Sequence, residues 1–172
     1  MRLKMVILMV ALTLSMAAAK TERLTGLVVR VVDGDTVRVR FTDGEKVVRL
    51  ANLDAPELTQ EGGAASQRAL AGYLPEGSQI RITSRGRDRY RRIIGEIYRP
   101  DGADVNVLQV RNGQAWVYTK YCRDPRYWQP LEARAREERL GLWVGKQPIP
   151  PWDYRGQQHP NSRAPARIDP ST

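Results

Sequence analysis

A series of three β-forming runs separated by very short turns constrains the fold more than any other feature of this chain. The runs are Leu24–Val32, Thr36–Phe41 and Lys46–Leu53, and each is rich in β-branched residues or alternates between apolar and polar positions. Asp33–Asp35 and Thr42–Gly44 supply turn-forming residues between them. Because such short connections force consecutive strands to pair as neighbours, the sequence predicts an antiparallel meander.

Two more strands are expected further along the chain, at Gln79–Thr83 and Arg92–Tyr98, joined by the basic segment Ser84–Arg91. Three helices are expected as well, each followed by a proline or glycine that ends it. They are Ala64–Leu74, Val105–Arg111 and Leu131–Leu140. The order of elements predicts an α+β fold that is mainly β, with five strands and three helices.

Residues 1–19 are typical of an export signal rather than of a folded segment. Arg2 and Lys4 give a positive start, Met5–Met16 is an apolar run, and Ala17–Ala19 offers small residues for cleavage after Ala19. An uncleaved membrane anchor is the alternative, but the run is shorter than the ~20 residues that span a bilayer. We therefore expect a secreted or periplasmic protein without a stable membrane association.

Cleavage would leave one domain, residues 20–144, followed by a tail, residues 145–172. The tail is rich in Pro, Gln and Arg without an apolar period, which predicts a flexible segment. The chain has 28 basic and 19 acidic residues, and loss of the two basic residues in the signal leaves 26 against 19, a charge of +7. This balance favours a polyanionic partner for an expected monomer, although basicity that serves only solubility is the alternative.

Histidine and cysteine are almost absent, and this excludes several kinds of chemistry. His159 is the single histidine and lies in the predicted tail, so a Ser/His/Asp triad, a histidine base and a His/Cys zinc cluster are not expected. Cys122 is the single cysteine, so no disulfide can form within the chain, and we expect it to pack as a small apolar residue. Any catalysis must depend on carboxylates, arginines and a hard metal ion.

Five residues form a set that suits such chemistry: Asp35, Arg49, Asp54, Glu57 and Arg92. A meander returns its third strand beside its second, so the carboxylates at these strand ends can converge. Together with a backbone carbonyl, two carboxylates make an oxygen-rich site that suits Ca²⁺. Guanidinium groups bind phosphate oxygens in pairs. Each residue taken alone fits an ordinary turn or solvated strand, and only the combined order and spacing indicate a site.

Three segments resemble the signature blocks of the staphylococcal nuclease (thermonuclease) family: Val32–Val37, Arg49–Glu57 and Asp88–Arg92. The resemblance extends to Val105–Gly113, Ala115–Tyr118 and Gly141–Trp143, and so covers roughly residues 24–144. It implies a five-stranded OB-type barrel with three helices. It also implies a calcium-dependent endonuclease that cuts DNA and RNA and leaves 3′-phosphate ends. The alternatives are a non-catalytic OB-fold module that binds nucleic acid and a basic structural protein of the cell surface.

The resemblance also implies roles for individual residues. Asp35 and Asp54 would bind Ca²⁺ with the main-chain carbonyl of Ala55, where many family members have Thr. Glu57 would act as the general base or orient the attacking water. Arg49 would clamp the scissile phosphate.

A second group of implied roles lies in the third block. Arg92 would be the second phosphate clamp, and Arg89 and Tyr90 would contact the bound nucleotide. The family commonly has Gly where this chain has Arg91, so a positive φ there would strain the turn by on the order of 1 kcal/mol. Alternation places Arg92 on the face of Ile94 and favours it as the clamp, with Arg91 as the alternative. Tyr118 and Tyr121 are further candidates for base stacking.

Overall fold

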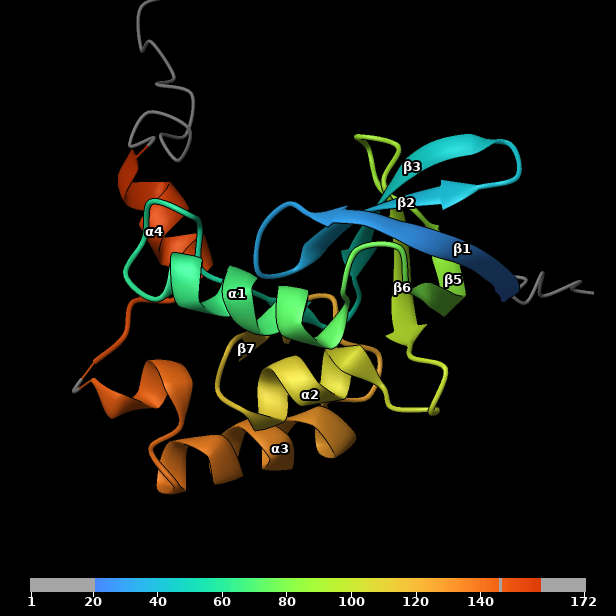
Figure 1. Cartoon of the computed structure of the whole chain (residues 1–172). Helices are drawn as coiled ribbons and strands as arrows, with labels where there is room; N and C mark the ends of the chain where they lie inside the picture. The colour runs from blue at the N-terminus through green and yellow to red at the C-terminus, as the bar shows by residue number, and fades with distance from the viewer. Residues whose placement is uncertain (1–20, 146, 159–172) are drawn as a thin grey trace, which may run out of the picture.

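A computed structural model describes residues 21–145 and 147–158 of the chain (Figure 1). Five strands close into a barrel in the order β1-β2-β3-β6-β5. They are β1 (Glu22–Val31), β2 (Thr36–Phe41), β3 (Gly44–Leu50), β5 (Gln79–Arg87) and β6 (Ile93–Tyr98). β3 and β6 pair in parallel and the other neighbours are antiparallel, which is the topology of an OB-type barrel. The expected meander of the first three strands is confirmed.

One strand is longer than the sequence indicated. β5 continues to Arg87 rather than ending at Thr83, because a register shift between Ser84 and Arg87 keeps the strand paired with β6. The basic segment is therefore partly strand, and the connecting turn is reduced to residues 88–92.

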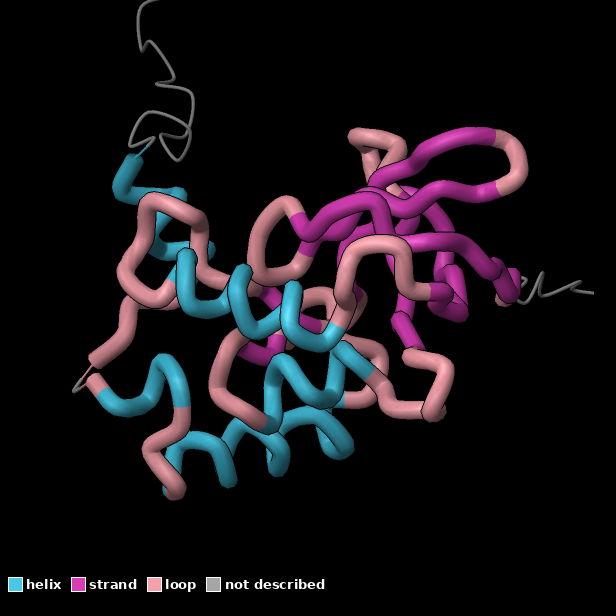
Figure 2. Tube along the Cα trace, in the orientation of Figure 1, coloured by secondary structure: helices cyan, strands magenta, loops and turns pink. Residues whose placement is uncertain are grey.

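Four α-helices lie in the described residues, where three were expected: α1 (Gly63–Tyr73), α2 (Val105–Arg111), α3 (Pro125–Glu137) and α4 (Pro151–Gln158), with a 3-10 turn at Gly141–Val144. Figures 1 and 2 show α1, α2 and α3 in succession beside one end of the barrel. Helices contain about as many residues as strands, and the predicted α+β class with an OB-type barrel is confirmed. No helix in the described part of the chain is long and apolar enough to cross a membrane.

The prediction for α3, Leu131–Leu140, placed both ends too late. The helix begins at Pro125, a residue well suited to a first turn, and it continues through Pro130. Trp128, 5 % exposed, packs into the barrel core and secures the turns on either side of Pro130. Arg139 has a positive φ of 53°, so the helix ends before Leu140.

The core fills the barrel and extends to the helices. Val39, Leu50 and Ile97 from the strands are fully buried, as are Leu70 of α1 and Val110 of α2. The Cys122 side chain is partly buried and packs against this core, as expected for a small apolar residue. The buried core therefore stabilises the domain without a disulfide.

Helix α4 lies in the segment where the sequence indicated no regular structure. Pro151 is buried and Trp152 packs against the cluster formed by Trp116 and Trp143. The predicted tail therefore begins with a docked helix. The predicted export signal and His159 lie outside the described residues.

Candidate active site

The turn between β1 and β2 fixes the position of Asp35. The backbone N–H of Asp35 donates to Asp33 Oδ1 at 3.0 Å, which closes the turn locally. Gly34 is required here because a Cβ would come within 2.0 Å of Ser66 Oγ on α1. Burial, and then the nearby charge of Asp35, raises the pKa of Asp33 to about 6. Asp35 itself is buried, with 6 % of its surface exposed.

A two-residue strand fixes Asp54. β4 (Leu53–Asp54) pairs with β7 (Trp116–Val117), so Asp54 lies opposite Trp116 and is 1 % exposed. Burial raises the pKa of Asp54, while a hydrogen bond from Arg155 opposes the rise. A carboxylate this deeply buried needs positive charge beside it.

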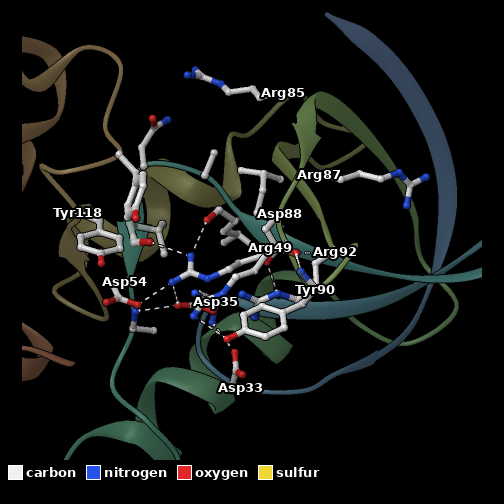
Figure 3. Close-up of a pocket in the computed structure, with 18 of the residues that line it drawn as sticks. Asp33, Asp35, Arg49, Asp54, Arg85, Arg87, Asp88, Tyr90, Arg92 and Tyr118 are labelled. Carbon is white, nitrogen blue, oxygen red and sulfur yellow. Dashed lines mark hydrogen bonds and ion pairs between the residues drawn. The ribbon is translucent and has the colours of Figure 1, made fainter. Parts of the chain in front are cut away.

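Arg49 on β3 supplies that charge to both carboxylates. Its Nη2 atom lies 3.1 Å from Asp35 Oδ2 and 2.6 Å from Asp54 Oδ1 (Figure 3). Its Nη1 atom donates to the carbonyl oxygens of Leu50 and Leu53 at 3.2 and 3.1 Å. Burial opposes the charge of Arg49, but Asp35 and Asp54 raise its pKa above the usual value. Three predicted site residues thus meet at Arg49 Nη2, which contacts the carboxylates of both Asp35 and Asp54.

The segment after β4 contributes the other predicted residues of this end. The backbone N–H of Ala55 donates to Asp35 Oδ2 at 3.0 Å, which ties the two strand ends together. The Glu57 side chain is 41 % exposed, and its Oε1 atom lies 2.7 Å from Arg155 Nη1. Glu57 therefore sits at the open side of the carboxylate cluster, where solvent can reach it.

The turn between β5 and β6 holds Arg92 in a different way. The carboxylate of Asp88 accepts hydrogen bonds from the backbone N–H of Tyr90, the backbone N–H of Arg92 and Arg92 Nε, at 2.9, 2.9 and 2.7 Å. Partial burial opposes ionisation of Asp88, but these bonds, led by that from the Arg92 side chain, lower its pKa. Asp88 organises the turn, and the sequence interpretation gave it no role although it lies in the third block.

Arg91 has a φ of 66°, so the departure from the family pattern does fall at a left-handed position. Its side chain is exposed and does not line the groove, whereas Arg92 and Ile94 do. Arg92 therefore lies on the groove side together with Ile94, although both arginines precede the first residue of β6.

Tyrosines provide flat surfaces along the groove. Tyr90 is 65 % exposed, with the guanidinium carbons of Arg89 and Arg92 4.8 and 5.6 Å from its ring centroid. Tyr118 and Tyr121 form an edge-to-face pair at 4.9 Å on the other side. Such rings can stack with unpaired bases, which is how single strands are commonly bound.

One groove is lined by the carboxylates of Asp35, Asp54 and Glu57 at its acidic end and by arginines along its length (Figure 3). Its arginines are Arg49, Arg85, Arg87, Arg89, Arg92, Arg123 and Arg155. All eight predicted site residues, from Asp35 to Arg92, line it. The sequence interpretation missed Asp88 and Arg155. The only sequence signal for Arg155 was Pro150–Trp152, which suggested that the start of the tail is attached.

The donors present fit a hard cation, although they are few. Among residues 21–145 and 147–158, no three His, Cys, Asp or Glu side chains are grouped to hold a metal ion. The predicted set needs only two carboxylates and a backbone oxygen. Oxygens of Asp35 and Asp54 already converge on one positively charged atom of Arg49, so these side chains are arranged to share a cation.

A buried carboxylate pair beside a row of guanidinium groups suits reaction at a phosphodiester. The site therefore places this protein in the class of phosphodiesterases. Residues 47–145 match the model of a family described as "Staphylococcal nuclease homologue". An "Uncharacterized endonuclease" of Escherichia coli is 44 % identical over 130 residues, 76 % of this chain and 84 % of the relative. The "Micrococcal nuclease" of Shigella flexneri is 35 % identical over 140 residues, 76 % and 79 % of the two chains. This chain belongs to the staphylococcal nuclease family, and it is a nuclease that acts on nucleic acid.

Proposed function

We propose that this nuclease is a calcium-dependent endonuclease that hydrolyses DNA and RNA and leaves 3′-phosphate ends. The observation that carries the proposal is the convergence of Asp35 Oδ2 and Asp54 Oδ1 on Arg49 Nη2, at 3.1 and 2.6 Å, beside an arginine-lined groove. Two carboxylates and a backbone oxygen impose few geometric demands, which suits the large and flexible Ca²⁺ better than Mg²⁺.

The residues of the chain divide the work between them. Asp35, Asp54 and the carbonyl of Ala55 would hold calcium, which supplies positive charge at the phosphate when bound. Glu57 is the exposed carboxylate of the cluster and would accept the proton of the attacking water, since no histidine is among the described residues that line the groove.

Two arginines would stabilise the added negative charge of the transition state. The Arg92 side chain is 31 % exposed and can meet a phosphate directly. The Arg49 side chain is 15 % exposed and is engaged with Asp35 and Asp54, so it also holds the carboxylates in place.

The test is cleavage of a supercoiled plasmid and of a single-stranded RNA by the purified protein. Cleavage of both is expected in Ca²⁺, with much slower cleavage in Mg²⁺ and none in EGTA. The ends should accept terminal-transferase extension only after phosphatase treatment. Equal rates in Ca²⁺ and Mg²⁺ would contradict the metal assignment, and binding without cleavage would indicate the non-catalytic module instead.

We also propose that the protein is exported and acts as a monomer. The support is the pattern of residues 1–19, with its positive start, apolar run and small residues before Lys20. Expression of the whole chain should give a secreted or periplasmic product that begins at Lys20, as measured by mass spectrometry. A membrane-bound product of full mass would show an uncleaved anchor, and light scattering measures the oligomeric state.

A further inference from the structure

Helix α4 is attached at the acidic end of the groove by several independent contacts. The Trp152 ring stacks on Tyr118, with centroids 5.4 Å apart and planes within 3°. The Tyr154 hydroxyl lies 3.2 Å from the carbonyl oxygen and from the side-chain oxygen of Thr59, and Gln60 Nε2 donates to the carbonyl oxygen of Ile149 at 2.5 Å. The helix is thus fastened to the segment that follows Asp54, beside the loop that leads into α1 (Figure 1).

This attachment delivers Arg155 to the carboxylates. Arg155 Nη2 lies 2.7 Å from Asp54 Oδ2, and Nη1 lies 2.7 Å from Glu57 Oε1 and 3.4 Å from Asp54 Oδ1. Arg49 already contacts Asp54 Oδ1 at 2.6 Å. Guanidinium groups therefore cover both oxygens of Asp54, and one of them also engages Glu57.

We propose that Arg155 is a further residue of this active site, and that it competes with the divalent cation for Asp54 and thereby sets the cation affinity of the enzyme. The inference rests on the proposed calcium site. Calcium binds carboxylate oxygens at about 2.3–2.6 Å, and Arg155 Nη2 now lies 2.7 Å from one such oxygen, Asp54 Oδ2. A guanidinium and a divalent cation on the same oxygens also repel each other.

The exposure of Arg155 makes exchange feasible. Its side chain is 40 % exposed, whereas that of Arg49 is 15 % exposed and is fixed by two backbone carbonyls. Arg155 can therefore leave by a movement of α4, and Arg49 remains. If the Arg155 contact is present about 90 % of the time, the apparent dissociation constant for calcium rises about tenfold.

The contact also extends the active site beyond the part of the chain that defines the family. The family match ends at residue 145, and Arg155 lies past it on a helix of its own. Trp152 on the same helix covers one face of Tyr118, a candidate base-stacking ring. Displacement of α4 would release the carboxylates and that ring together.

Isothermal titration of the purified protein with calcium, without nucleic acid, tests the proposal. Arg155→Gln should tighten calcium binding by about tenfold. Trp152→Ala, which loosens α4 without altering a carboxylate, should change the affinity in the same direction. Gln157→Ala is the matched control, because Gln157 lies exposed on α4 and should leave the affinity unchanged.

Asp54→Asn separates failure of this inference from failure of the calcium site itself. If Asp54→Asn abolishes calcium binding while Arg155→Gln and Trp152→Ala leave it unchanged or weaker, the competition is overturned and the calcium site stands. If neither wild type nor Arg155→Gln binds calcium, both are overturned. Circular dichroism spectra and melting curves establish that each variant is folded.

Discussion

The two ends of the groove are held in place by different kinds of interaction. At the acidic end, Asp35 and Asp54 are 6 % and 1 % exposed, and they meet Arg49 across strand ends that only the closed barrel brings together. At the other end, Arg92 is half-buried and is positioned by Asp88, four residues earlier in the same turn.

This difference predicts which substitutions change the stability of the fold and which change only the turnover. Removing a buried charge partner leaves the remaining charge unpaired in the interior, which strongly destabilises a fold. A half-buried ion pair within one turn, such as Arg92 with Asp88, contributes less to stability, because water still reaches and screens it. Substitutions of the buried charges at the acidic end should therefore affect folding and turnover together, and those at the arginine turn should affect turnover almost alone.

The largest effect is expected for Arg49→Ala, which leaves the Asp35 and Asp54 carboxylates side by side without their shared cation. The free energy of unfolding in EGTA should fall by on the order of 3 kcal/mol, as measured by urea denaturation. Arg38→Ala is the matched control, because Arg38 on β2 is half-exposed and makes a long ion pair, with Nη1 3.9 Å from Glu45 Oε2. Equal stability of the two variants would show that the buried charge cluster contributes no more to stability than a surface ion pair does.

Glu57→Gln should lower turnover by on the order of 10²–10⁴ through loss of the proton acceptor. Its stability should change by less than about 1 kcal/mol, because the side chain is 41 % exposed. Turnover is measured at saturating calcium, with Glu61→Gln in the neighbouring exposed loop as control. Near wild-type turnover of Glu57→Gln would exclude this residue from the mechanism.

At the arginine turn, residues 88–92, Arg92→Ala and Arg91→Ala should affect different kinetic parameters. Loss of Arg92, a transition-state contact, should lower kcat by about 10²–10³. Loss of Arg91 should mainly raise KM and reduce the salt dependence of substrate binding by about one counterion. Kinetics over a salt series measure both, and loss of turnover in Arg91→Ala with only a KM change in Arg92→Ala would reverse the assignment.

The smallest effect concerns the backbone of the same turn. Arg91 has a φ of 66°, a conformation that glycine adopts without strain. Arg91→Gly should raise the free energy of unfolding by about 0.5 kcal/mol, because relief of strain is partly offset by the greater freedom of the unfolded chain. Arg91→Ala retains the strained Cβ and should not gain, so equal melting temperatures of the two variants would show that no strain is relieved.

The sequence predicted elements well where local pattern and tertiary packing agree. Alternation and turn residues located β1, β2 and most of β3, because neighbouring strands joined by short turns have few other ways to pair. The predicted start of α3, Leu131, was too late, because α3 begins at Pro125 and continues through Pro130, where burial of Trp128 outweighs the low helix propensity of proline. Propensity is a weak guide wherever a large side chain can be buried.

The sequence by itself determined which residues could carry the chemistry. Asp35, Arg49, Asp54, Glu57 and Arg92 were identified from their order and spacing, and all of them line the groove. Only the tertiary structure decided how they are paired. In the structure, Arg49 pairs with two carboxylates and Arg92 pairs with Asp88. Arg155 pairs with Asp54, which lies 101 positions earlier in the chain. The reason is physical: a local pattern reports the preferences of neighbouring residues, whereas a buried charge is matched by whichever opposite charge the fold brings within reach.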